Sequence, residues 1–95
     1  MNFRKKRTSR GFDYREFTDT YGMKCSIQES SAACVQAIWL GINDPQPKYF
    51  PGNGTGWHDY ELPDNVQVST RMHLDRKTVK KILPVLQKFA ETGEL

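Results

Sequence analysis

Apolar and polar residues alternate along three segments in the first half of the chain, residues 14–21, 24–30 and 35–42. This two-residue repeat predicts β-strands that each bury one side. The first two segments meet at Tyr21 and Gly22, so we expect them to form a hairpin. The third, "VQAIWLGI", is the most apolar run, and we expect a central strand covered on both faces.

The stretch "VSTRMHLDRKTVKK", residues 68–81, changes from a two-residue repeat to a helical one at Asp75. Its first half predicts a strand within residues 66–74. Its second half begins a long helix, for which Asp75 is a good N-cap and Gly93 a good C-cap. Pro84 lies on the polar side of this helix and predicts a kink. One apolar face is formed at helical spacing by Val79, Ile82, Leu83, Leu86, Phe89 and Ala90.

A long loop, residues 43–64, connects these two parts and contains four of the five prolines. A loop of about 20 residues is uncommon in a small domain and is either functional or partly disordered. Its aromatic residues argue against disorder. Two of them, Trp57 and Tyr60, predict either a stacking lid over a ligand or anchors that hold the loop to its own sheet.

Together these elements predict an α+β fold, an antiparallel sheet of three to five strands with one long C-terminal helix packed across it. A chain of 95 residues makes one domain. We place the domain at residues 12–95, after a flexible basic arm at residues 1–11. The core of so small a domain is marginal, so we expect a homo-oligomer, which adds buried area without lengthening the chain.

The net charge of +3 originates in the first 15 residues, which hold six cations and one anion. The other 80 residues hold eight cations and ten anions. The arm therefore suits nucleic-acid phosphates, which bind cations without sequence preference. The alternative is a solubilising tail, or an arm that docks on an acidic partner. The candidate cations of the arm are Arg4, Lys5, Lys6, Arg7 and Arg10.

Other classes of function have little support in the sequence. No apolar run reaches the roughly 18 residues of a membrane span, and the first residues lack the apolar core of a signal peptide. We therefore expect a cytoplasmic protein with reduced cysteines. Cys25, Cys34, His58 and His73 lack the paired short spacings of a zinc site. We expect no metal, no cofactor and no enzymatic activity, because no nucleophile or carboxylate motif is present.

Cations gather where the predicted strand is followed by the helix. Arg71 and His73 share one face of the strand, and Arg76 is the first residue after Asp75. The start of a helix attracts phosphate or carboxylate through its free amides and partial positive charge, so these residues predict an anion site. The alternative is that Asp75 occupies those amides itself and the arginines pair with surface acids.

A second set of candidate residues lies in "CSIQESS", residues 25–31. Ser26, Gln28 and Ser30 project from one face of the predicted strand, where they suit hydrogen bonds to a sugar or a base. If this strand lies beside the strand at residues 66–74, Gln28 and Arg71 converge. The alternative is an ordinary solvated face of the sheet.

Four stretches of the chain, "YGMKCSIQESS", "AIWLGI", "RMHL" and "LPVLQKFAETGEL", resemble a group of small, mostly uncharacterised proteins of phages and prophages. The resemblance covers most of residues 14–42 and 70–95 and leaves out the arm and the long loop. It implies a bacterial host and a counter-defence role, in which the protein binds a defence protein or captures a nucleotide signal.

The favoured hypothesis is a non-catalytic protein that binds an anionic, nucleotide-like ligand. One alternative is an inhibitor that binds a protein of a bacterial defence system through a sheet edge or the aromatic loop. Another is a nucleic-acid-binding protein that acts through the basic arm. The residues expected to contact the small ligand are Gln28, Ser30, Arg71, His73, Arg76, Trp57 and Tyr60.

Overall fold

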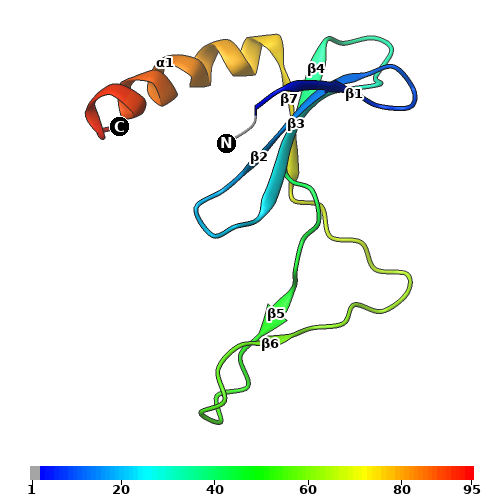
Figure 1. Cartoon of the computed structure of the whole chain (residues 1–95), viewed down its shortest axis with the longest axis vertical. Coiled ribbons are helices and arrows are strands. Elements are labelled where there is room, and N and C mark those ends of the chain that lie inside the picture. The colour runs from blue at the N-terminus through cyan, green and yellow to red at the C-terminus, as the bar shows by residue number, and fades with distance from the viewer. Residues whose placement is uncertain (1–2) are drawn as a thin grey trace.

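A computed structural model describes residues 3–95 as a five-stranded antiparallel sheet, a separate two-stranded hairpin and one helix (Figure 1). The strand order in the sheet is β1-β2-β3-β4-β7, and β5 pairs with β6. The predicted α+β class is confirmed. The elements are β1 Lys5–Arg7, β2 Asp13–Thr18, β3 Lys24–Glu29, β4 Ala37–Ile42, β5 Lys48–Tyr49, β6 His58–Asp59, β7 Arg71–Asp75 and α1 Arg76–Thr92.

The register of the sheet sorts its side chains onto two faces. Gln28 pairs with Trp39, and Trp39 with His73, so these three lie in a row on one face, here called the Trp39 face. The next row along, from Ile27 through Leu40 to Met72, lies on the opposite face, the Leu40 face. Over β3, β4 and β7 the Leu40 face is mostly apolar, with Cys25, Ile27, Ile38, Leu40, Ile42, Met72 and Leu74 beside Glu29. Over β2 and β1 it carries Phe17 and the charged residues Asp13, Arg15, Lys5 and Arg7.

The predicted hairpin forms between β2 and β3, with its turn held by Asp19. The Asp19 carboxylate accepts hydrogen bonds from the backbone amides of Tyr21 and Met23, both at 2.9 Å. An aspartate that bonds amides two and four residues later closes a turn locally. The first strand therefore ends at Thr18, three residues before the sequence pattern ends.

The sequence predicted a flexible basic arm at residues 1–11, and part of this segment forms a β-strand. Lys5–Arg7 form an edge strand that pairs with β2. Carboxylates on β2 face the arm: Glu16 lies 3.3 Å from Lys6, and Asp13 lies 3.3 Å from Arg7. These cations favour pairing with β2, because its acids offset their charge. Residues 1 and 2 of the predicted arm lie outside the described residues.

The last strand is shorter than predicted, because its partner ends. β4 stops at Ile42, so β7 begins opposite Gly41, at Arg71, and residues 66–70 form no strand. Nor is β4 covered on both faces, since all six of its residues are only half-buried. From its apolar sequence, β4 was expected to be fully buried, and within one chain it is only half-buried.

The helix has the predicted ends but not the predicted packing. Asp75 is its N-cap and Gly93 its C-cap, with the Gly93 amide donating to the Phe89 carbonyl at 2.8 Å. The helix is continuous across Pro84. It extends away from the sheet instead of packing across it (Figure 1), and none of its residues is buried. The reason is that Arg76 follows Asp75 directly, with no loop that turns the helix back.

The chain buries little of its surface. Among residues 3–95, only Cys25 and Ser26 are buried. The accessible surface is 8095 Å², whereas a folded monomer of this mass exposes about 5,600 Å². The Cα radius of gyration is 16.7 Å, compared with about 12 Å for a compact domain of this length. Within the described residues, no helix is long and apolar enough to cross a membrane.

Gly41 provides a test of how closely β4 and β7 approach. A Cβ atom there would collide with the carbonyl oxygen of Thr70 and lie 2.8 Å from the Cα of Arg71, at a φ of +154°. We expect Gly41→Ala to lower the free energy of unfolding in urea by roughly 2 kcal/mol or more, from backbone strain and overpacking. The control is Gly22→Ala, which has a φ of +84° but open space around it. Equal losses in the two variants would contradict the close approach.

Candidate functional site

Five side chains meet on the Trp39 face and form the site, here called the Trp39 cluster: Gln28, Ser30, Trp39, Arg71 and His73. The Arg71 guanidinium lies 5.6 Å from the Trp39 ring centroid and donates through Nη1 to Gln28 Oε1 at 3.2 Å. The His73 ring lies 4.3 Å from the Trp39 ring, and its Nε2 is 2.8 Å from Ser30 Oγ. The cluster thus joins a cation, an imidazole, an amide and a hydroxyl around one indole.

The sheet register explains why these residues converge. The sequence brought Gln28 and Arg71 together on the assumption that their strands are neighbours. In the structure β4 lies between β3 and β7, and the two side chains still bond across it. The residue opposite Arg71 is Gly41, which has no side chain, so the guanidinium extends over β4 toward Trp39 and Gln28.

A small cavity of about 150 Å³ opens beside the Trp39 cluster. The turn between β1 and β2 contributes Arg10 and Phe12 to its wall, with the Arg10 guanidinium 5.6 Å from the Phe12 ring. Two arginines and two aromatic rings therefore border one cavity, together with Glu29, whose carboxylate accepts a hydrogen bond from the Asp13 amide. Pockets that hold a whole small-molecule ligand have volumes of about 300–1,000 Å³. This smaller cavity therefore accommodates one group of a ligand, and the remainder lies over the sheet.

Trp39 and Phe12 are the site residues that the sequence analysis missed. Trp39 was assigned to the apolar run as a packing residue, although it alternates with Ile38 and Leu40 and so takes the opposite face. That alternation was the available signal, since it places Trp39 on the face of Gln28 once the register is known. Nothing in the sequence pattern links Phe12 to β7.

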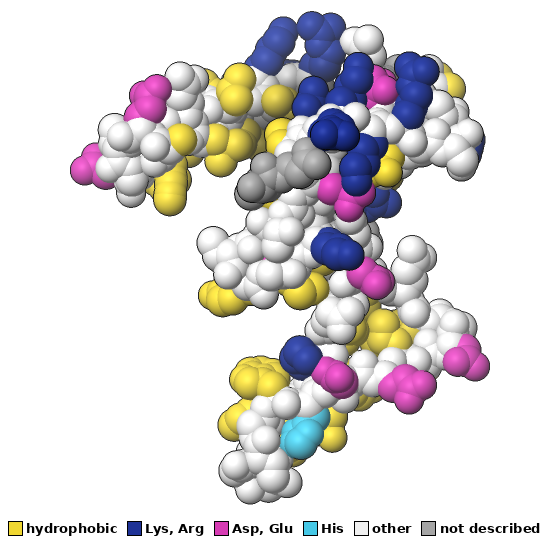
Figure 2. Space-filling model, viewed as in Figure 1, with side chains coloured by type: hydrophobic (Ala, Val, Ile, Leu, Met, Phe, Trp, Pro, Cys, Tyr) yellow, Lys and Arg dark blue, Asp and Glu magenta, His cyan; other side chains and the backbone are white. Residues whose placement is uncertain are grey.

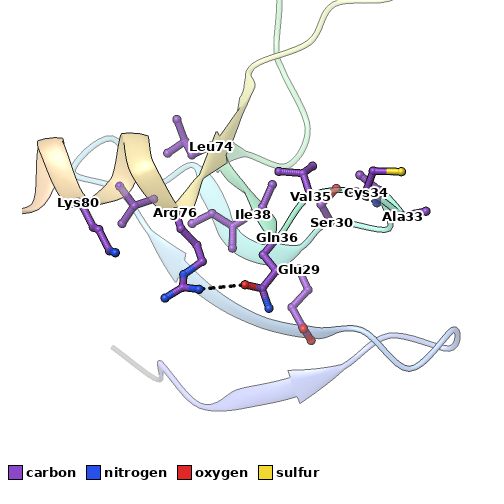
Figure 3. Close-up of a pocket in the computed structure, with 13 residues that line it drawn as sticks. Glu29, Ser30, Ala33, Cys34, Val35, Gln36, Ile38, Leu74, Arg76 and Lys80 are labelled. Atoms are coloured by element: carbon purple, nitrogen blue, oxygen red, sulfur yellow. Dashed lines mark hydrogen bonds between the residues drawn. The ribbon is translucent and has the colours of Figure 1, made fainter.

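Arg76 does not belong to the Trp39 cluster. It donates to Gln36 at 3.1 Å and lines an open groove of about 870 Å³ between the start of α1 and the loop that precedes β4 (Figure 3). Ser30 of the Trp39 cluster also lies at the wall of this groove. Most of the other residues around this groove are apolar, including Val35, Ile38, Leu74 and Val79. The predicted grouping of Arg76 with Arg71 is therefore wrong.

At the helix start the structure has the alternative that the sequence left open, in which Asp75 occupies the first turn itself. Asp75 itself caps the helix, because its Oδ1 accepts from the amide of Thr78 at 2.8 Å. Hydrogen bonds from the side chain and the backbone amide of Thr78 lower the pKa of Asp75 below its ordinary value. A carboxylate that stays ionised at the helix N-terminus repels a second anion there. The side chains that the sequence grouped at this junction have other partners: Arg71 bonds Gln28, His73 contacts Ser30 and Arg76 bonds Gln36.

Trp57 and Tyr60 lie in the hairpin around β5 and β6, which extends beyond the sheet (Figure 1). Trp57 packs against Phe50, with ring centroids 5.2 Å apart, and Tyr60 packs edge-on against Tyr49 at 6.0 Å. The structure therefore does not bring either residue over Arg71 as a lid, and the loop aromatics anchor the hairpin to itself. Trp57 remains 68% exposed.

The cations of the basic arm are mostly engaged within the sheet. Lys5 lies 3.8 Å from Asp13, and Lys6 and Arg7 form the closer ion pairs described above. Arg4 also has an interaction partner. Figure 2 shows Lys and Arg side chains gathered over the part of the sheet nearest the helix. Only Arg10 joins the cavity beside Trp39.

The possible metal ligands and thiols are dispersed. Among residues 3–95, no three His, Cys, Asp or Glu side chains lie close enough to hold a metal ion together. Cys25 is buried and Cys34 is exposed, and both are free thiols.

Comparisons with known proteins identify no relative of this chain: no family model, no curated protein and no solved structure matches it.

Proposed function

We propose that this protein binds an anionic, nucleotide-like ligand at the Trp39 cluster without transforming it. The observation that carries the proposal is the position of Arg71, which lies over the Trp39 ring while it bonds the Gln28 amide. A guanidinium on an aromatic face, beside an amide edge, matches the three parts of a nucleotide: phosphate, planar base and base edge.

Each group of the site has a role in this proposal. Arg71 and Arg10 provide planar, charged donors for phosphate oxygens. The ring surfaces of Trp39 and Phe12 provide stacking surface for a base, and Gln28 offers both a donor and an acceptor to its edge. The small cavity holds one of these groups, and the remainder of the ligand lies along the Trp39 face.

The sequence resemblance to small phage proteins is compatible with capture of a nucleotide signal and equally with binding of a defence protein, so it does not choose between the two. His73 Nε2 and Ser30 Oγ lie 2.8 Å apart, the separation of a general base and the nucleophile that it activates. The test therefore includes recovery of the ligand after incubation, to determine whether the protein has altered it. An unaltered ligand is expected.

A second candidate function is binding to a protein of the host through the β5–β6 hairpin. Its aromatic side chains are exposed, from 47% for Tyr49 to 68% for Trp57, and exposed aromatic patches are common at protein interfaces. This function predicts no stabilisation by any small molecule.

The test is a thermal-unfolding screen of the full chain with ADP-ribose, nucleoside triphosphates, cyclic dinucleotides and a short single-stranded oligonucleotide. A ligand is expected to raise the unfolding temperature of the wild type and not of Arg71→Ala, since ligand binding stabilises only the folded state. Arg76→Ala is the matched control, because Arg76 bonds Gln36, lies outside the cavity beside Trp39, and should leave the shift unchanged.

Three outcomes contradict the proposal. The first is the absence of a shift with every compound in the panel, and the second is an equal loss of the shift in both arginine variants. The third is breakdown of the ligand by the wild type, which would indicate catalysis. A shift with the oligonucleotide alone, strongly weakened by salt, would instead identify single-stranded nucleic acid as the ligand.

A further inference from the structure

No residue of the described range 3–95 packs against the apolar face of α1 along most of its length. Leu83 and Leu86 are each 55% exposed and Phe89 is 48% exposed. Figure 2 shows the hydrophobic side chains that gather along the helix. An isolated helix of this length is marginal in water, and in proteins an amphipathic helix is stabilised by packing of its apolar face.

Among the described residues, Phe3 packs edge-on against Phe17 on the Leu40 face, with ring centroids 6.0 Å apart, and the part of this face over β4 and β7 is uncovered. Met72 is 54% exposed, and Ile27, Ile38 and Leu40 are only half-buried. An apolar sheet face is stable when a helix or a second sheet covers it. One chain therefore exposes two apolar surfaces of the kinds that pack together in folded proteins, a helix face and a sheet face.

The dimensions of the two surfaces agree. α1 has 17 residues, which gives a length of about 25 Å. The five strands of the sheet span about 19 Å across four strand spacings. One helix is therefore long enough to cross the whole sheet. It does not cross its own sheet, because β7 continues into α1 without a loop.

We propose that two copies of this chain form a dimer by reciprocal exchange of α1, so that the helix of each copy covers the Leu40 face of the other. Such an interface is isologous, with the same two surfaces used twice about a two-fold axis. It involves mainly the face opposite the Trp39 cluster and requires no ligand, and it approaches the cluster only at Ser30, at the wall of the groove beside α1.

The surface area of the chain supports this assembly. Each copy exposes 8095 Å², about 2,500 Å² more than a folded monomer of its mass. An obligate homodimer buries about 2,000–5,000 Å² in total, or about 1,000–2,500 Å² from each copy. The excess surface of one chain is therefore large enough to supply its half of a stable interface.

Charge along α1 supports the same pairing. Its first six residues include four cations, Arg76, Lys77, Lys80 and Lys81, and no anion. The end of the chain after Lys88 has two anions, Glu91 and Glu94, and no cation. When the two-fold axis is perpendicular to the helices and they lie side by side, they run antiparallel, and the basic half of each lies near the acidic end of the other. The partial charges of the helix ends add to this attraction.

The groove at the start of α1 is the place where the partner helix enters. It is about 870 Å³ in volume and is lined by Val35, Ile38, Leu74 and Val79, with Arg76 and Lys80 also at its wall (Figure 3). Ile38 and Leu74 belong to the Leu40 face, so the groove is continuous with the apolar surface that the partner helix covers.

The first test is sedimentation velocity of the full chain. The expected species has twice the chain mass of 11.0 kDa. Leu86→Lys is expected to shift it to the mass of one chain, because a charge replaces an apolar contact of the interface. Gln87→Lys, which adds the same charge at the next residue, is the control and should leave the dimer intact. A wild-type protein that sediments as a monomer at every concentration overturns the proposal.

The second test locates the interface without weakening it. A photo-reactive phenylalanine analogue at the position of Met72, on the Leu40 face, is expected to cross-link to α1 of the other copy. The same analogue at Tyr21, which is 92% exposed at the tip of the β2–β3 hairpin, should give no cross-link between chains. A dimer in which Met72 cross-links only to segments other than α1 overturns the exchange, even if Leu86→Lys fails to fold.

Discussion

Replacement of Trp39 by alanine is expected to weaken nucleotide binding by about 5- to 150-fold. Stacking of a base on an aromatic side chain contributes about 1–3 kcal/mol as measured by alanine substitution, and each 1.4 kcal/mol is about tenfold in affinity. The variant also removes the surface on which Arg71 and His73 are ordered, 5.6 and 4.3 Å from the indole ring. Few other single changes affect as much of the site.

The chain has two tryptophans, so the second must be removed before fluorescence reports on the site. In a Trp57→Phe background, ligand is expected to change the emission of Trp39 with a saturable dependence on concentration. Trp39→Phe, which keeps a ring for stacking, is the conservative control and should retain most of the affinity. If Trp39→Ala binds as tightly as the wild type while its circular dichroism is unchanged, the ligand does not contact this ring.

The temperature of unfolding is expected to rise with chain concentration. For a dimer whose folding requires association, a hundredfold increase in concentration stabilises the folded state by about 2.7 kcal/mol. For a folded unit of two chains this corresponds to a rise of roughly 5–10 °C. Most monomeric domains show no such dependence, so the effect is diagnostic of a folded state that depends on a second copy.

Calorimetry at several concentrations measures this rise, with Gln87→Lys as the control that should behave like the wild type. Leu86→Lys should unfold at a lower temperature that is independent of concentration. A wild-type unfolding temperature that stays constant over the same range would contradict the exchange of α1, whatever the mass of the species at one concentration.

The parts of the fold that were predictable from the sequence are the ones set by local chemistry. The hairpin is closed by Asp19, which bonds amides two and four residues away. The helix begins at a capping aspartate and ends at a glycine with a φ of 76°. Each of these signals acts within a few residues, so the pattern of the chain contains it.

The parts that were not predictable depend on partners distant in the chain. An apolar helix face predicts that something covers it, but not whether the sheet belongs to the same chain or to another. The charged residues Lys5–Arg7 give no alternation that marks a strand, and they pair because Asp13 and Glu16 lie opposite.

The candidate site shows the same division. Gln28, Ser30, Arg71 and His73 were recognised as ligand-type residues on strand faces, and the structure brings these four together. Their common centre, Trp39, required the register of β4 between β3 and β7. Arg76 was grouped with them because it begins the helix after β7, and Trp57 and Tyr60 because a long loop could close over the site. Each lies elsewhere in the fold.

The most direct test of the proposed function is a titration of the ¹⁵N-labelled full chain with ADP-ribose and with a cyclic dinucleotide, followed by NMR. The proposal predicts saturable shifts at the Trp39 indole N–H, at the Gln28 side-chain amide and along β7, with little change in α1 or in the β5–β6 hairpin. Shifts confined to the hairpin or to the helix, or no shifts with either compound, would contradict the assignment of the Trp39 cluster as the ligand site.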